Sequence, residues 1–173
     1  MQYAIFDMDG TLIDSMPAWS RLGGDYLRSK GVTPPDDLRD KVASMTMLEC
    51  GEYASGLGVP GSPQVIAGEL TAWMERQYRE TIPEREGVQD YLRLCRDAGV
   101  KMCVATATDR ILAEACLERL GLLDFFAFVV SCEDIGKTKT APDIYLLAAE
   151  RLGASPAEIV VYEDVLYPAE TAK

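Results

Sequence analysis

The sequence predicts an α/β fold, in which helices cover both faces of a parallel sheet and a small all-helical segment is inserted after the first strand. Short apolar runs of strand length alternate with helical patterns at the start of the chain and again from Gly87 onward. Repeated units of this length imply right-handed crossovers between parallel strands. Between these regions, residues 16–82 show helical patterns and no strand pattern. A chain of 173 residues buries about two-thirds of its unfolded surface, enough for a core with a small appendage.

The first predicted strand is the apolar run at residues 4–6, which ends on Asp7 and Asp9 and is closed by Gly10. Residues two apart in a strand point the same way, so the two carboxylates can share one cation or one reacting phosphoryl group. A surface turn or the start of a calcium loop is the simpler alternative, but no acidic residue follows at the twelfth position, which is Ala18. The pair therefore outlines a reaction centre.

Four helices are predicted in the inserted segment. They cover residues 17–30, a stretch opened by Pro34 and Pro35, residues around 47–57, and residues 63–79. Gly31 stops the first helix, and the two prolines suit the first turn of the second. We expect the apolar residues of these helices to pack in a core rather than line a substrate pocket, and the most prominent are Trp19, Trp73, Met45 and Met47.

The second part of the chain supplies three more strands, each preceded by a helix. The predicted helices cover residues 88–98, 109–120 and 142–152, and the predicted strands cover 101–105, 127–131 and 159–162. A glycine follows each helix, as is common at helix ends. Pro168 opens one more helix after the last strand.

Reactive side chains follow the predicted strands. Asp7 and Asp9 end the first strand, Thr106, Ala107 and Thr108 follow the second, the third leads toward Lys137 and Lys139, and Glu163 and Asp164 follow the fourth. In open parallel sheets, ligands bind at the carboxyl ends of the strands. We therefore expect acidic, hydroxyl and lysine groups to converge on one edge of the sheet.

These groups suit metal-assisted phosphoryl transfer. Several carboxylates stay ionised near one point only if a cation shares the site. Oxygen ligands from Asp7, Asp164 and the backbone carbonyl of Asp9 suit Mg²⁺. A free carboxylate beside the ion can act as a nucleophile and form an aspartyl phosphate. Lys139 would offset the phosphoryl charge, Thr106 would donate a hydrogen bond, and Asp9 would shuttle the proton.

The composition excludes several other functions. The chain has no histidine, which removes Ser–His triads, Cys–His dyads and histidine-ligated zinc. Its net charge of −11 argues against nucleic acid and against an acidic membrane surface as partners. No apolar run approaches the roughly 18 residues of a membrane span, and no secretory segment is recognisable, so we expect a cytoplasmic protein. The five cysteines form no CxxC pair, and we expect them to be reduced packing residues.

Four motifs occur in a characteristic order. They are Asp7-Met8-Asp9-Gly10-Thr11-Leu12-Ile13-Asp14-Ser15, Thr106 after a strand, Lys139 with Pro142-Asp143, and Glu163-Asp164. In this order they resemble the motifs of the haloacid dehalogenase-like hydrolase superfamily, in its phosphatase and β-phosphoglucomutase-like branch. The resemblance implies a Rossmann-like core at residues 1–15 and 83–173, and a helical cap at 16–82 that closes over the site and selects substrates. Members of the family continue into at least one more strand, so we expect this core to lack its C-terminal strand.

The resemblance also implies a role for each motif residue. Asp7 would attack phosphorus, and Asp9 would act as acid and base. Thr106, Ala107 and Lys139 would hold the phosphoryl group, while Asp7, Asp9, Asp164 and Glu163 would form the Mg²⁺ site. The implied activity is that of a Mg²⁺-dependent phosphatase of small phosphorylated metabolites, such as sugar phosphates.

Several alternatives stay open. Lys139 is followed by Thr140 where the family usually has proline, so Lys137 is a rival for the motif lysine. A sugar phosphomutase is the alternative enzyme, although the cap lacks the histidine that β-phosphoglucomutases have near its start. A catalytically silent protein that binds metal or phosphorylated metabolites is the alternative of another class. Arg110 could contact the substrate, but a position on the helix surface is the simpler expectation. The oligomeric state stays open as well.

Overall fold

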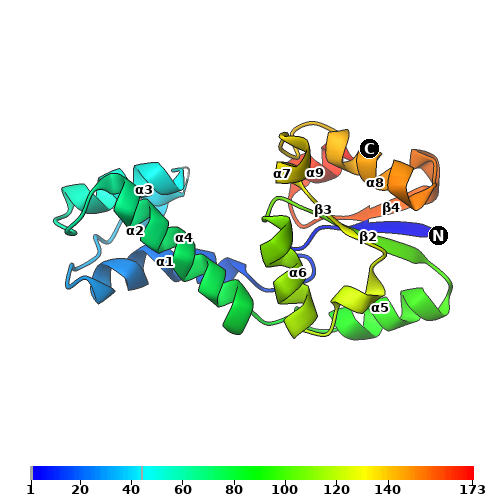
Figure 1. The fold of residues 1–173 in the computed structure, drawn as a ribbon, viewed down its shortest axis with the longest axis horizontal. Helices are drawn as coiled ribbons and strands as arrows, with labels where there is room; N and C mark the ends of the chain where they lie inside the picture. The colour runs from blue at the N-terminus through cyan, green and yellow to red at the C-terminus, as the bar shows by residue number, and fades with distance from the viewer. Residues whose placement is uncertain (1, 44) are drawn as a thin grey trace. The chain divides into compact units, whose positions relative to one another are not determined.

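The computed structural model describes residues 2–43 and 45–173, which form two units (Figure 1). The α/β unit comprises the chain up to Ser15 together with Tyr78–Lys173, and the helical unit is Met16–Gln77. The second boundary falls inside helix α4 (Pro63–Glu80), so Tyr78 and the residues after it belong to the α/β unit. Among the helices of the described residues, none combines the length and the apolar character that crossing a membrane requires.

In the described chain, four parallel strands form the sheet of the α/β unit, in the order β3-β2-β1-β4. They are β1 (Tyr3–Phe6), β2 (Lys101–Thr106), β3 (Val129–Ser131) and β4 (Ile159–Tyr162). Each strand coincides with a predicted apolar run, so the predicted parallel α/β fold is confirmed. The register places Phe6 beside Val104 of β2 and Tyr162 of β4. The residues that follow these strands therefore leave the sheet at the same edge.

Helices cover both faces of this sheet (Figure 1). α5 (Val88–Asp97) and α6 (Arg110–Arg119) lie on one face, and α7 (Cys132–Ile135), α8 (Asp143–Leu152) and α9 (Leu166–Thr171) lie on the other. The 3-10 helices η1 (Leu123–Phe125) and η2 (Pro156–Glu158) precede β3 and β4. One core cluster joins α8 to the sheet, and its buried members are Ile5, Cys103, Ala105, Val130, Ile144, Tyr145, Ala148 and Leu152. This packing fixes the position of α8, and with it that of Tyr145, against the sheet.

No sequence pattern predicts helix α7, because four residues are too few to show a helical period. The helix is specified instead by its ends. Ser131 and Asp134 form a capping box, in which the Asp134 N–H donates to Ser131 Oγ at 3.3 Å and the Ser131 N–H donates to Asp134 Oδ2 at 3.0 Å. Gly136 ends the helix with a φ of 64°. The chain then enters the loop that carries Lys139.

The helical unit contains α1 (Met16–Ser29), α2 (Leu38–Val42), α3 (Met47–Gly56) and most of α4, in agreement with the predicted helical insert. A capping box between Thr46 and Glu49 begins α3. Gly51 of α3 lies against the carbonyl oxygen of Pro63, where a Cβ atom would come within 2.2 Å. Helix α3 therefore packs closely against the start of α4, and a larger residue at this position would separate them.

The expectation that all four prominent apolar residues pack in a core is wrong for three of them. Trp19, Met45 and Met47 line a cavity of about 930 Å³ in the helical unit, and Trp19 is 40% exposed. The short helix α2 borders the same cavity through Leu38, Arg39 and Val42. Trp73 instead packs edge-on against the buried ring of Tyr26, with ring centroids 6.4 Å apart.

Candidate active site

Asp7 lies directly after β1, where the sheet fixes its backbone. Its N–H donates to the carbonyl oxygen of Tyr162 in β4 at 2.9 Å, and the residue is only 7% exposed. The chain then turns sharply, because the N–H groups of Leu12 and Ile13 both donate to the carbonyl of Met8, at 2.9 and 3.0 Å. This tight turn keeps Asp7 and the residues after it at the carboxyl edge of the sheet.

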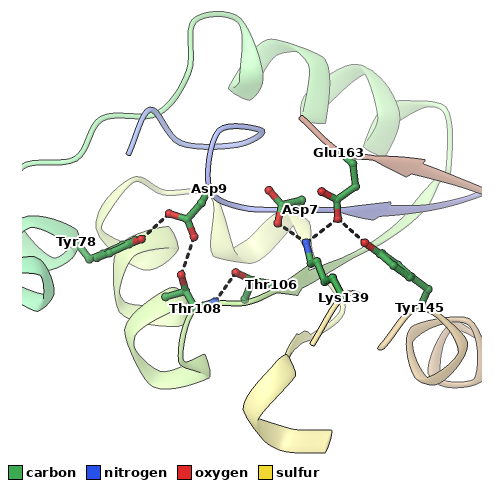
Figure 2. A network of polar contacts seen from close by, with 8 residues as sticks. All are labelled: Asp7, Asp9, Tyr78, Thr106, Thr108, Lys139, Tyr145 and Glu163. Atoms are coloured by element: carbon green, nitrogen blue, oxygen red, sulfur yellow. Dashed lines mark hydrogen bonds and ion pairs between the residues drawn. The ribbon is translucent and has the colours of Figure 1, made fainter. Parts of the chain in front are cut away.

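Lys139 is the cation that faces Asp7 (Figure 2). Its Nζ donates to Asp7 Oδ1 and, at 2.6 Å, to Glu163 Oε1, and the residue is 4% exposed. Tyr145 donates its hydroxyl to the same Glu163 oxygen at 2.6 Å. Lys137 is instead exposed and forms an ion pair with Asp143. The lysine that reaches the first aspartate is therefore Lys139, which follows the order of the motifs.

Burial and charge shift the pKa values of this group. Burial raises the pKa of Asp7 to about 7, with Lys139 opposing the shift and the negative charges of Glu163 and Asp9 adding to it. Burial alone would lower the pKa of Lys139, but Asp7 and Glu163 together outweigh it and the pKa is raised. Lys139 therefore stays charged at neutral pH. Burial and the neighbouring Glu163 also raise the pKa of Tyr145, so its hydroxyl remains a donor.

The same edge of the sheet carries a candidate metal site. Carboxylate oxygens of Asp7, Glu163 and Asp164 lie within 4.8 Å of one another. Gly10 makes room for Asp164, because its φ is +88° and a Cβ atom there would lie 2.0 Å from Asp164 Oδ2. A donor set made only of oxygens suits a hard cation such as Mg²⁺. Because Lys139 offsets only one of the three carboxylates, a divalent cation fits the remaining charge.

Asp9 is held away from this acidic cluster by two hydroxyl groups (Figure 2). Tyr78 donates to Asp9 Oδ1 at 2.6 Å, and Thr108 donates to Asp9 Oδ2 at 2.6 Å. The Asp9 carboxylate is therefore engaged on both oxygens. We therefore expect Asp9 to contribute its backbone carbonyl, rather than its side chain, to a metal site.

The loop after β2 supplies hydroxyl and backbone groups. Thr106 is the last residue of β2 and is fully buried, and its Oγ1 accepts a hydrogen bond from the N–H of Thr108 at 3.0 Å. Ala107 lies between them and is exposed. Asp109 then caps α6 by accepting from the N–H of Leu112 at 3.0 Å. Since Thr106 Oγ1 is an acceptor in this bond, its own proton is available to a second group.

The predicted residues thus form two neighbouring groups on one edge of the sheet. Asp7, Lys139, Glu163 and Asp164 make the first, and Asp9 with the loop of Thr106, Ala107 and Thr108 makes the second. Arg110 is exposed and pairs with Asp134 and Glu114, so the simpler expectation for it is confirmed. Tyr78 and Tyr145 were absent from the predicted set, because each occupies a buried position within a helical pattern and resembles a packing residue.

Comparison with known proteins identifies the family. A family model described as haloacid dehalogenase-like hydrolase matches residues 1–173. The phosphorylated carbohydrates phosphatase of Thermotoga maritima is 29% identical over 100% of this chain and 81% of its own length. Hexitol phosphatase B of Escherichia coli is 33% identical over 93% of this chain and 74% of its own length. A solved β-phosphoglucomutase-like structure from Thermotoga maritima superposes with a TM-score of 0.90 at 29% identity, covering 99% of this chain and 80% of that one. The chain belongs to the haloacid dehalogenase-like hydrolases.

Proposed function

We propose that this chain is a Mg²⁺-dependent phosphatase that hydrolyses small phosphorylated sugars or similar metabolites through an aspartyl phosphate on Asp7. One observation carries the proposal: a buried carboxylate at the end of β1 faces a buried lysine and shares an acidic cluster with Glu163 and Asp164. Relatives at 29% and 33% identity include a phosphatase of phosphorylated carbohydrates and a hexitol phosphatase. These names support a sugar phosphate, or a compound like it, as the substrate.

In the first half-reaction, a carboxylate oxygen of Asp7 attacks phosphorus and the bond to the leaving oxygen breaks. Asp9 gives its proton to that leaving oxygen. Lys139 and the Thr106 hydroxyl, which has a proton free to donate, stabilise the charge on the phosphoryl oxygens. When bound by Asp7, Asp164 and the backbone carbonyl of Asp9, with Glu163 beside them, Mg²⁺ would neutralise part of the same charge.

In the second half-reaction, water attacks the phosphorus of the Asp7 phosphate. Asp9 takes a proton from this water, the bond between phosphorus and Asp7 breaks, and inorganic phosphate leaves. Asp9 thus returns to its protonated form, and Asp7 regains its carboxylate. The helical segment at 16–82 is proposed to act as the cap that selects among phosphate esters.

The test is phosphate release from a panel of sugar phosphates, nucleotides and an aryl phosphate, with and without Mg²⁺, by the wild type and by Asp7→Asn. The proposal expects release that depends on the metal and is lost in the variant. Substantial metal-dependent turnover by Asp7→Asn would contradict the covalent scheme. Metal binding without turnover of any ester would favour a silent binding protein instead.

A sugar phosphomutase is the second candidate, and the structural match at a TM-score of 0.90 to a β-phosphoglucomutase-like protein favours it. A mutase returns the phosphoryl group to a different oxygen of the sugar, so it produces an isomer without free phosphate. Product analysis on β-glucose 1-phosphate, with and without a bisphosphorylated sugar, separates the two candidates.

A further inference from the structure

Both carboxylate oxygens of Asp9 are held by neutral hydroxyl donors. Tyr78 donates to Oδ1 and Thr108 donates to Oδ2, each at 2.6 Å, and Tyr78 is only 1% exposed. Two short bonds, one to each oxygen, fix both the position and the plane of a carboxyl group, because rotating it would break at least one of them. The orientation of Asp9 is therefore set by these two side chains.

This arrangement leaves Asp9 able to carry a proton. Each carboxyl oxygen has two lone-pair directions, so one hydroxyl bond to each oxygen leaves a second direction on each. Neither Tyr78 nor Thr108 is charged, so Asp9 forms hydrogen bonds but no ion pair with these two residues. The contrast with Asp7 is direct, since Asp7 is bonded to Lys139. The two aspartates therefore have different partners, a lysine for Asp7 and two neutral hydroxyl groups for Asp9.

The backbone of Tyr78 is itself fixed by Arg119 of α6. The guanidinium donates to the Tyr78 carbonyl through Nε at 3.2 Å and through Nη2 at 3.1 Å, and Nη2 also donates to the carbonyl of Ile82. The last carbonyls of a helix have no partners within the helix, so Arg119 satisfies groups at the end of α4 that otherwise need water. Thr108 lies two residues before the start of α6. One helix therefore supports both donors, Thr108 at its start and Tyr78 through Arg119 at its end.

We propose that Tyr78 is a positioning residue of this enzyme: its hydroxyl, together with that of Thr108, orients Asp9 to protonate the leaving oxygen of the substrate. The inference rests on the proposed function, because it requires Asp9 to be the acid of the first half-reaction. It adds a residue that lies outside every motif of the sequence. Arg119 contributes indirectly, by holding the backbone of Tyr78.

The test compares two classes of leaving group. An alkyl phosphate such as a hexitol phosphate must release a basic alkoxide, which needs a proton in the transition state, whereas 4-nitrophenyl phosphate releases a stable phenolate that needs little help. In a reaction with a covalent intermediate, kcat/KM reports the steps up to formation of that intermediate. The ratio of the two kcat/KM values therefore isolates the proton transfer to the leaving group.

Tyr78→Phe is expected to lower kcat/KM for the hexitol phosphate by about 10- to 100-fold, and that for 4-nitrophenyl phosphate by less than about threefold. Thr108→Val is expected to act in the same way, and Arg119→Met in the same direction but less strongly. The matched control is Tyr26→Phe, which removes another buried tyrosine hydroxyl bonded to a carboxylate, that of Glu69 at 2.5 Å. It is expected to leave the ratio unchanged.

Other outcomes would overturn the inference. Equal losses for both substrates would mean that Tyr78 matters for packing only, and thermal unfolding of each variant would show the accompanying loss of stability. Faster turnover of the hexitol phosphate by Tyr78→Phe would mean that Tyr78 restrains Asp9 instead of orienting it for proton transfer. A wild type that hydrolyses no phosphate ester of the substrate panel with Mg²⁺ would remove the proposed function itself, and this inference with it.

Discussion

Replacing Gly10 by alanine tests how the turn after β1 supports the acidic cluster. Gly10 has a φ of +88°, and an added Cβ atom would lie 2.0 Å from Asp164 Oδ2. Cβ atoms essentially never approach other atoms within 3.0 Å, so the two atoms must separate by at least the missing 1.0 Å. Asp164 is exposed, so the end of its side chain can move more easily than the backbone of Gly10. The expected result is a folded protein in which Asp164 is displaced.

The size of the effect differs between stability and activity. A positive φ is unfavourable for alanine by about 1–2 kcal/mol, a loss that a domain with about 5–15 kcal/mol of stability tolerates. A displacement of about 1 Å in a group that binds the metal or substrate lowers the rate by about 100-fold. We therefore expect Gly10→Ala to unfold at slightly lower urea concentration, to bind Mg²⁺ more weakly, and to lose about 100-fold in metal-dependent phosphate release.

Gly87→Ala is the matched control. Gly87 has a similar φ of +82° but no atom within 4 Å of an added Cβ, so it carries the backbone strain without the contact. Urea unfolding should show similar losses in the two variants, while calorimetric Mg²⁺ titration and phosphate release should separate them. Two results would show that the placement of Asp164 at the metal site is wrong. In one, Gly10→Ala keeps the metal affinity and turnover of the wild type. In the other, Gly87→Ala loses as much metal affinity and turnover as Gly10→Ala does.

Two further predictions concern the buried charges. Lys139→Met leaves Asp7 and Glu163 without their cation, so we expect it to abolish turnover and to reduce the free energy of unfolding of the metal-free protein in urea by about 3–5 kcal/mol. The control is Lys137→Met, at an exposed ion pair, which should change the free energy of unfolding by less than about 0.5 kcal/mol. The pKa of Asp7 in the folded protein is about 7, against an ordinary value of 3.8, so the folded protein binds this proton more tightly than the unfolded chain does. The resulting contribution to the free energy of unfolding is complete below pH 3.8 and is lost as the pH rises through 7. We therefore expect the free energy of unfolding of the metal-free wild type, minus that of metal-free Asp7→Asn, to fall by up to about 4 kcal/mol between pH 4 and 8 in urea unfolding. A difference that does not change with pH would refute the raised pKa of Asp7.

The fold, and the site residues that lie at strand ends, can be predicted from local sequence patterns. Each strand is an apolar run, and a parallel sheet brings the ends of its strands to one edge, so the sequence alone is enough to place Asp7, Thr106 and Glu163 together. The choice of Lys139 over Lys137 could not be made in this way. It depends on how the loop after α7 turns, and α7 is specified only by the capping box of Ser131 and by Gly136.

The supporting side chains were harder to predict. Tyr78 and Tyr145 lie on helices, at buried positions where a tyrosine resembles a packing residue, and their hydroxyl groups meet Asp9 and Glu163 only through tertiary contacts. The cavity beside Trp19 could not be predicted for a similar reason, because helical spacing identifies an apolar face but does not show what packs against it.

The most direct test of the central claim is chemical trapping of the phosphorylated enzyme. The protein is mixed with Mg²⁺ and a sugar phosphate that it hydrolyses, and the reaction is quenched in acid within one turnover. The quenched protein is then treated with borohydride, which reduces an aspartyl phosphate to homoserine. Peptide mass spectrometry should then find homoserine at position 7 in place of Asp7, and only when both substrate and metal were present. Efficient turnover with Asp7 unmodified, or with the modification at Asp9 or another carboxylate, would contradict the proposal that Asp7 is the nucleophile.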